Sequence, residues 1–419
     1  MNKETLAKFE QAKKVFAKYG VDVDAALKHF SQIPISLQCW AGDDVTGFEG
    51  VEGVVNENTV VGNYPYAART PDELRMDMEK AFSLSPLKHK VQLHSIYAEF
   101  QTERSQLTVE DFRNWINWAK KLGIGLDLNG TFFSSKMMDD GLSLTSPNKE
   151  VRDYWIEVGK STRKCCVDIG RELGIPCYNN FWIPDGLKDI TIDRQVFRQR
   201  LIEGLDAIYA EPYTEEESKH VIDVLEGKYF GIGTEHFVVG SHEFYVGYAA
   251  KHNLGVTIDT GHFREAEDVA DKITAIEPFV NGVMLHVSRP VHWDSDHTVI
   301  ENDCLHGVLR ELKRANLLDK VGIGLDFFDA SINRVFEWTI GLRATAKALL
   351  MALLEPTELM REAELNRDYS TRLFYVEENN NLPYNDVWNY LLESKGILGG
   401  QEALESLKQY EAEVQSLRK

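Results

Sequence analysis

The residues from 285 to 297 bring nitrogen and oxygen ligands close together in the chain. Three imidazoles and two carboxylates fall within this segment: His286, His292, Asp294, Asp296 and His297. An apolar run, Val283-Met284-Leu285, leads directly into it, as expected of a buried strand that delivers side chains to a site at its carboxyl end. Mixed carboxylate and imidazole ligation suits Mn²⁺, Zn²⁺, Co²⁺ or Mg²⁺. For this segment alone, an acidic solvated loop with a stray histidine is the alternative.

Other apolar runs end in the same kind of residue. Seven ligand-type side chains follow four successive runs: Glu226, Asp259, His262, His286, Asp294, Asp296 and Asp326. Taken singly, each has an ordinary explanation as a surface glutamate, a helix N-cap aspartate or a core histidine. Their occurrence together at four successive strand ends favours a metal site over these explanations.

The seven residues divide into two predicted cation sites. One cation would be held mainly through oxygen by residues from four consecutive strands: Glu226, Asp259, His286 and Asp326. A second, nearby cation would be held by the remaining three: His262, Asp294 and Asp296. Two-metal sites with a bridging carboxylate have metal separations of about 3.5–4 Å. Asp294 and Asp296 are two residues apart, so in an extended segment both carboxylates point the same way.

Three further residues are candidates for contact with a substrate. Lys228 follows Glu226 by two residues, and beside two dications its ammonium gains nothing electrostatically. We therefore predict that Lys228 polarises a substrate oxygen, against the alternative of a surface lysine. His94 could hydrogen-bond a substrate ring or hydroxyl, and Trp182 could form an apolar wall. Taken singly, both are more often core residues.

Eight short apolar runs would position these side chains. They cover residues 35–40, 91–97, 124–132, 176–183, 221–226, 256–259, 283–287 and 321–328. Their Val, Ile and Leu content suits parallel strands that are buried on both faces. Strands alternating with helical segments predict an α/β fold, a (β/α)₈ TIM barrel, with an open doubly wound sheet as the alternative. The barrel is favoured because the ligand-type residues follow several strands rather than one switch point.

Helix signals fill the spacers between the runs. Thr108 and Asp111 predict a capping box, and Gly123 predicts the end of that helix. The glycine-rich segment 41–70 shows neither helix nor strand pattern, and a long loop at this place predicts a lid over a site. We predict three parts: an N-terminal helical segment, 1–34, a barrel, 35–343, and a C-terminal helical extension for packing and subunit contacts, 344–419.

The composition limits the partners and the compartment. The 419 residues carry a formal net charge of −20, which disfavours nucleic acid and anionic membranes as partners. Five cysteines without a CxxC spacing indicate reduced thiols, and neither a signal-peptide pattern nor a membrane-spanning apolar run occurs. We therefore expect a cytoplasmic protein.

These residues resemble the L-rhamnose isomerase family, within the wider xylose isomerase-like barrel group. The segment Trp293-Asp294-Ser295-Asp296-His297 is highly specific to that family. The other matching segments are Ser36-Leu37-Gln38-Cys39-Trp40, Gly42-Asp43-Asp44-Val45, Leu93-His94-Ser95-Ile96-Tyr97, Trp182-Ile183-Pro184-Asp185-Gly186, Gly231-Ile232-Gly233, Asp259-Thr260-Gly261-His262-Phe263 and residues 324–331.

The resemblance implies interconversion of L-rhamnose and L-rhamnulose by a homotetramer with a Mn²⁺-type dimetal site, with Zn²⁺ or Co²⁺ possible at one position. The catalytic-metal ligands of the family fall on His262, Asp294 and Asp296. Its structural-metal ligands fall on Glu226, Asp259, His286 and Asp326. Its oxygen-polarising lysine falls on Lys228. The expected catalytic residues are therefore Lys228, Asp296 and Asp326, and the expected substrate-binding residues are His94, Trp182 and Lys228.

An aldose–ketose isomerase moves hydrogen between C1 and C2 either through an enediol or as a hydride. No strong base stands apart from the expected metal ligands, which favours a metal-assisted 1,2-hydride shift. One rival interpretation is a metal-dependent phosphoesterase or endonuclease on the same barrel type, which the net charge of −20 disfavours. Another is a protein that only binds a metal or sugar, which Lys228 and the glycine-rich loop disfavour.

Overall fold

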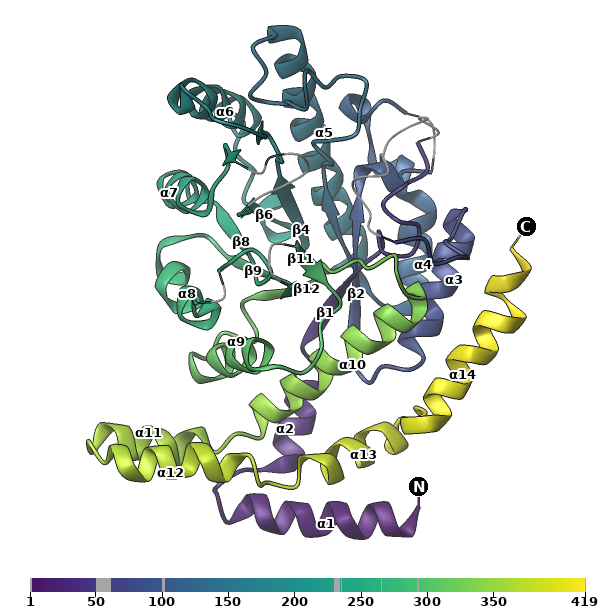
Figure 1. Ribbon diagram of the computed structural model, residues 1–419, viewed down its shortest axis with the longest axis vertical. Helices are drawn as coiled ribbons and strands as arrows, with labels where there is room; N and C mark the ends of the chain where they lie inside the picture. Colours follow the sequence, from purple (N-terminus) through teal and green to yellow (C-terminus); the bar gives the residue numbers. More distant parts are fainter. Residues whose placement is uncertain are drawn as a thin grey trace.

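Eight parallel strands close into a barrel in the order β1-β12-β9-β8-β6-β4-β3-β2 (Figure 1). The computed structural model describes residues 2–49, 62–99, 102–229, 234, 236–264, 266–291 and 294–418, without the side chains of Asp294 and Ser295. The barrel strands are β1 (Pro34–Gln38), β2 (Lys88–His94), β3 (Gly125–Asn129), β4 (Cys177–Trp182), β6 (Val221–Gly227), β8 (Gly255–Asp259), β9 (Val283–Val287) and β12 (Gly322–Leu325). Because β1 pairs with both β2 and β12, the predicted barrel is confirmed and the open sheet is excluded.

A helix follows each barrel strand and packs on the outside of the barrel (Figure 1). These eight are α3 (Pro71–Phe82), α4 (Arg113–Leu122), α5 (Lys149–Leu173), α6 (Arg194–Ile208), α7 (His242–His252), α8 (Val269–Ile276), α9 (Asp303–Arg314) and α10 (Arg334–Leu353). Two helices precede the barrel: α1 (Lys3–Ala17) and α2 (Val23–Phe30). Within the described ranges, no helix has the length and apolar character needed to cross a membrane.

Local signals set the ends of these helices. The predicted capping box at Thr108 and Asp111 is present, but it opens a 3₁₀ turn, Val109–Phe112, that leads into α4. Gly123 ends α4 in the left-handed conformation, at φ 67°, where a residue without a Cβ is favoured. Asn148 caps the start of α5 by accepting a hydrogen bond from the backbone N–H of Glu150.

Within the residues that the structure describes, four short strands lie outside the barrel. Strands β5 (Gly186–Leu187) and β7 (Phe237–Val238) pair with each other, as do β10 (Arg289–Val291) and β11 (Asp294–His297). The β10–β11 hairpin follows β9 directly, where the sequence predicts only a loop. Strand β11 carries Asp296 to the carboxyl end of the barrel, where it lies near His262.

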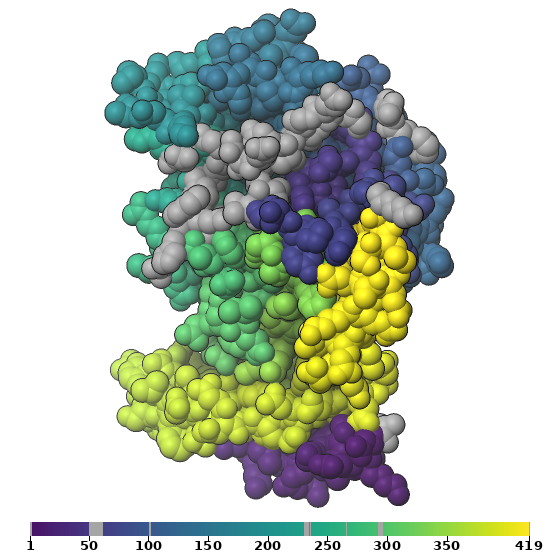
Figure 2. Space-filling model, turned by 45° about the vertical axis from the view of Figure 1, so that its right-hand side comes forward, coloured from purple at the N-terminus to yellow at the C-terminus, as the bar shows by residue number. Residues whose placement is uncertain are grey.

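The C-terminal helices pack around the base and one side of the barrel. They are α11 (Thr357–Leu365), α12 (Tyr369–Asn379), α13 (Tyr384–Ser394) and α14 (Gly400–Glu413). Figure 2 shows the last of them, in yellow, against the side of the molecule, and the N-terminal helices, in purple, at its base. Helix α13 packs on α1, where the rings of Phe9 and Tyr390 stack at 3.6 Å. Helix α10 runs unbroken across residue 343, where the sequence analysis ends the barrel.

Phe327, just after β12, packs so closely against Gly341 of α10 that the contact leaves no space for a larger residue. A Cβ added to Gly341 would lie 2.0 Å from Cζ of the fully buried Phe327, the residue after Asp326. We predict that Gly341→Ala lowers the free energy of unfolding by about 1–3 kcal/mol through overpacking.

Gly247→Ala in α7 is the matched control. The added Cβ meets no described atom within 4 Å, so the exchange should raise stability by about 0.4–1 kcal/mol. Thermal melting of both variants against the wild type measures the two effects. A similar shift in both variants would contradict the contact argument.

Candidate metal centre

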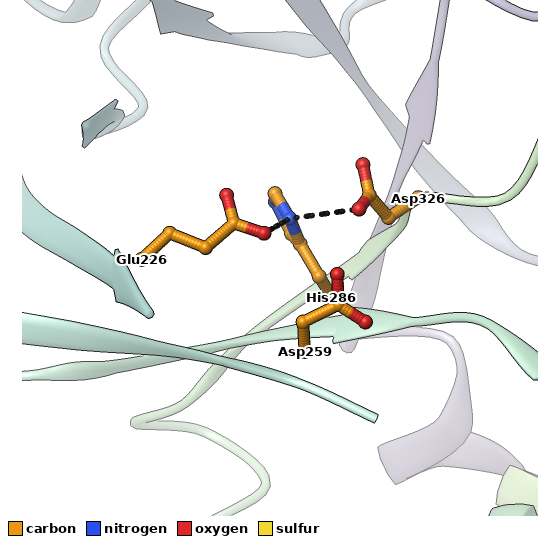
Figure 3. A group of neighbouring side chains, drawn as sticks. All are labelled: Glu226, Asp259, His286 and Asp326. Carbon is orange, nitrogen blue, oxygen red and sulfur yellow. Dashed lines mark hydrogen bonds and ion pairs between the residues drawn. The ribbon is translucent and has the colours of Figure 1, made fainter. Parts of the chain in front are cut away.

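Four side chains converge where β6, β8, β9 and β12 end. They are Glu226, Asp259, His286 and Asp326, and one ligand atom from each lies within 4.8 Å of the others (Figure 3). The register of the barrel explains the convergence, because Asp259 pairs directly with His286 and Val287 pairs with Leu325. All four residues are buried. The structure therefore brings together every residue that the sequence assigns to the first cation.

A second group of ligand atoms adjoins the first and shares Asp259 with it. The group consists of Asp259, His262 and Asp296. His262 Nε2 lies 3.7 Å from Asp259 Oδ2 and 3.5 Å from Asp296 Oδ1. Asp296 belongs to β11, and its carbonyl accepts a hydrogen bond from the N–H of Phe328 at 3.0 Å. The side chain of Asp294, predicted as a ligand of the second cation, lies outside the described residues.

The His286 ring lies between the carboxylates of Glu226 and Asp326 (Figure 3). Its Nδ1 is 3.0 Å from Glu226 Oε1 and 3.6 Å from Asp326 Oδ2. Burial alone would lower the pKa of His286, but these two carboxylates raise it well above its ordinary value. Burial raises the pKa of Asp326 to about 7. The pKa of Glu226 falls to about 2 because His286 and Lys228 outweigh the effect of its burial.

Lys228 is buried inside the cluster, so it is not a surface lysine. Its Nζ lies 2.5 Å from Asp259 Oδ2, 2.8 Å from Asp326 Oδ2 and 3.1 Å from Glu226 Oε1. Burial would lower the pKa of Lys228, but the surrounding carboxylates raise it well above its ordinary value. The ammonium is therefore charged and compensates part of the negative charge of the cluster.

The donor set fits divalent cations. Carboxylate oxygens with one or two imidazoles are the ligands that Mn²⁺ and related ions accept. Asp296 Oδ1 is buried and accepts no hydrogen bond within the described part of the chain. A buried carboxylate oxygen without a donor is unfavourable, and a cation at the second group would satisfy it.

An aromatic wall begins beside the cluster at Trp182. Nζ of Lys228 lies 5.1 Å from the centre of the half-buried Trp182 ring. The ring centres of Phe133 and Trp182 are 5.2 Å apart. The ring centre of His94 lies 5.8 Å from that of Phe133 and 4.6 Å from that of Trp40. Burial lowers the pKa of His94 to about 3, so its ring is neutral, and its Nδ1 hydrogen-bonds with Thr131 Oγ1 at 3.1 Å.

The sequence analysis did not select two members of this wall, Trp40 and Phe133, as site residues. A signal was present, because both follow the ends of barrel strands, as the ligands do. It also did not select three polar residues that hydrogen-bond to ligands: Gln92, Asn180 and Ser288. The predicted lid at 41–70 includes residues 50–61, which lie outside the described residues. His292, Trp293 and residues 231–233, which the sequence analysis also names, lie outside them too.

The fold and the cluster first define a class, an enzyme-like barrel with a buried group of candidate cation ligands at the carboxyl end of its strands. Within that class, residues 3–418 match the L-rhamnose isomerase (RhaA) family. The chain belongs to the L-rhamnose isomerase family. It is an isomerase of the aldose–ketose type, and the phosphoesterase alternative is not favoured.

Relatives named L-rhamnose isomerase are similar over nearly their whole length. The protein of Pectobacterium carotovorum subsp. carotovorum (strain PC1) is 47% identical over 413 residues, which cover 98% of each chain. That of Listeria monocytogenes serotype 4a (strain HCC23) is 47% identical over 414 residues, again 98% of each chain. A solved L-ribulose 3-epimerase structure is 13% identical, with a TM-score of 0.45, over 73% of this chain and 97% of the other.

Cation binding to the first group should release protons. The raised pKa of His286 means that its ring is protonated near neutral pH, and a cation must displace the proton on Nδ1. We predict that Mn²⁺ affinity rises between about pH 6 and 8, by about tenfold per pH unit for each proton released.

Calorimetric titration in buffers of different ionisation enthalpy counts these protons. His29→Gln is a suitable control, because His29 pairs with Asp319 at 3.0 Å, away from the cluster, and its loss should leave the pH dependence unchanged. An affinity that is independent of pH would contradict the protonated state of His286.

Proposed function

We propose that the protein interconverts L-rhamnose and L-rhamnulose by a 1,2-hydride shift at a site for two divalent cations. The observation that carries this proposal is the pair of ligand groups that share Asp259 at the carboxyl end of the barrel. Relatives that are named L-rhamnose isomerase, at 46–47% identity, support L-rhamnose as the substrate. The formal net charge of −20 is consistent with a small neutral sugar rather than a nucleic acid.

The residues of the two groups would hold the cations. We assign Glu226, Asp259, His286 and Asp326 to a structural cation, and His262, Asp294 and Asp296 to a catalytic one. The oxygen-rich donor set suits Mn²⁺ at both positions, with Zn²⁺ or Co²⁺ as alternatives at one of them. Bound divalent cations act as Lewis acids that polarise the oxygens of the substrate.

Lys228 would stabilise negative charge on O1 of the sugar. Its ammonium lies within 3.1 Å of three carboxylates that are also candidate cation ligands. When those carboxylates bind cations, a substrate oxygen becomes the better partner for the ammonium. A fixed positive charge in a buried site stabilises an oxyanion strongly because no solvent has to reorganise around it.

The aromatic wall would hold the sugar and exclude water. The neutral ring of His94 has its Nδ1 engaged by Thr131, and we assign its Nε2 to a sugar oxygen. Trp182 and Phe133 would pack against the carbon face of the substrate. Each described carboxylate of the two groups is a candidate cation ligand, so none stands apart as a base. This arrangement favours hydride transfer over an enediol.

One experiment tests both the substrate and the route. Protein loaded with Mn²⁺ is incubated with L-rhamnose in D₂O, and the ketose is followed by NMR. We expect L-rhamnulose without deuterium at C1 in early turnover, because a hydride that crosses from C2 to C1 does not equilibrate with water. Deuterium at C1 would replace the hydride route by an enediol, while the absence of any ketose would overturn the function. Chelator-treated protein and a phosphodiester substrate are the negative controls.

Lys228→Met tests the role of the ammonium. Removing one preorganised charge stabiliser of this kind costs about 10²–10³ in turnover, and we expect a loss of that size with cation binding retained. Lys219→Met, at an exposed position just before β6, is the matched control and should behave as wild type. Undiminished turnover in Lys228→Met would remove the lysine from the mechanism.

We propose a homotetramer, supported by an exposed apolar row on the C-terminal helices. Leu365 is 78% exposed, Leu373 66% and Phe374 63%, and large apolar side chains exposed together mark protein contacts. Sedimentation at micromolar concentration should give a tetramer, and Phe374→Lys should weaken it. A stable wild-type monomer would refute the assembly.

A cytoplasmic location is also proposed, supported by the five free thiols of the chain.

A further inference from the structure

A layer of uncharged polar side chains lies beneath the first group of ligands. Gln92 on β2, Asn180 on β4 and Thr257 on β8 are all buried. Two of them hydrogen-bond to the outer atoms of His286 and Glu226. The layer therefore contacts two candidate cation ligands from the side away from the cluster.

The amide of Gln92 has one possible orientation. Its Nε2 donates to Leu325 O at 2.9 Å and to Ser36 O at 3.3 Å, which engages its N–H groups. Its Oε1 therefore faces His286 Nε2, at 2.7 Å. Close packing fixes this arrangement, because a Cβ on Gly324 would lie 2.3 Å from Gln92 Nε2.

The orientation of Gln92 decides which nitrogen of His286 can bind a cation. An amide oxygen only accepts hydrogen bonds, so His286 Nε2 must carry a hydrogen. The lone pair available to a cation is then on Nδ1, the atom that faces Glu226 and Asp326. Gln92 thus fixes both the tautomer and the direction of the imidazole.

Asn180 acts on Glu226 in the same way. Its Oδ1 accepts from Thr257 Oγ1 at 2.7 Å, so its Nδ2 faces Glu226 and donates to Oε2 at 2.5 Å. The other oxygen, Oε1, then points toward His286 Nδ1 and Lys228. One carboxylate oxygen is held below the cluster and the other is presented to it.

We propose that Gln92 and Asn180 are positioning residues that present His286 Nδ1 and Glu226 Oε1 to the structural cation; this inference rests on the proposed dimetal function. Partners behind the ligands of a metal typically change its affinity by 10–100-fold when they are removed. Neutral amides suit this place, because they orient the ligands without adding charge to a cluster that is already rich in carboxylates.

The first test compares Gln92→Leu with Gln92→Glu. Both exchanges remove the amide that donates to Leu325 O and Ser36 O, but a glutamic acid held neutral by burial beside these two carbonyl oxygens keeps an oxygen that accepts from His286 Nε2–H. Free Mn²⁺, counted by its electron paramagnetic resonance signal, gives affinity and stoichiometry. We expect an affinity loss of about 10–100-fold for the tighter site in Gln92→Leu and near wild-type affinity in Gln92→Glu. Equal losses in both, or none in Gln92→Leu, would overturn the role of Gln92.

The second test compares neighbouring asparagines on β4. Asn179 Nδ2 donates to Asp223 Oδ1 at 2.6 Å, the same amide–carboxylate bond that Asn180 makes, but Asp223 belongs to neither ligand group. Asn179→Leu and Asn180→Leu should lower the melting temperature of chelator-treated protein to a similar degree. Only Asn180→Leu should lose Mn²⁺ affinity. Equal Mn²⁺ affinity in these two variants would show a purely structural role for Asn180.

The wild-type protein separates this inference from the function on which it rests. If the wild-type chain binds two Mn²⁺ ions and the Gln92→Leu and Asn180→Leu variants bind them with the same affinity, the positioning roles alone are overturned. A wild-type chain that binds no Mn²⁺ would overturn the dimetal function as well.

Discussion

The site depends on one electrostatic constraint: four carboxylates and two imidazoles converge in a largely buried volume. A buried carboxylate without a partner costs on the order of several kcal/mol, so positive charge and hydrogen-bond donors must surround each one. Lys228 lies within 3.1 Å of three of the carboxylates, and His286 lies between two. Asp259 also accepts hydrogen bonds from Ser288 Oγ and the Gly261 N–H, both at 2.9 Å. These contacts allow four carboxylates to lie together, largely buried, at the carboxyl end of a closed barrel.

The two ligand groups also differ in how firmly the barrel holds their side chains in place. Three members of the first group are held in register by strand pairing, and a slip of one residue would turn Asp259 or His286 to the opposite face. The second group depends partly on Asp296, which belongs to a hairpin held to the end of β12 by the Phe328 N–H. A fixed group suits a structural cation, while a hairpin outside the barrel suits a position where ligands and substrate exchange.

Most barrel strands were predictable because they are buried on both faces and appear as short apolar runs. The candidate ligands were predictable because they follow those runs. The inward face of β2 was not: Lys90, Gln92 and His94 alternate with Val91 and Leu93, and only closure of the barrel shows that both faces are buried. Gln92 reaches His286, 194 residues away, and such a contact leaves no local pattern in the chain. The β10–β11 hairpin was missed because its strands are short and lack apolar alternation.

The position of Asp259 in both ligand groups would link two cations bound there thermodynamically. A carboxylate shared between two sites donates less charge to either when both are filled, and the two dications repel each other. Occupancy at one position would therefore change the affinity of the other, and the change would be reciprocal by the same factor. With both positions filled, the two sites would form a single coupled equilibrium, and the activity of this chain would respond to metal supply along a curve whose steepness depends on the shared carboxylate of Asp259.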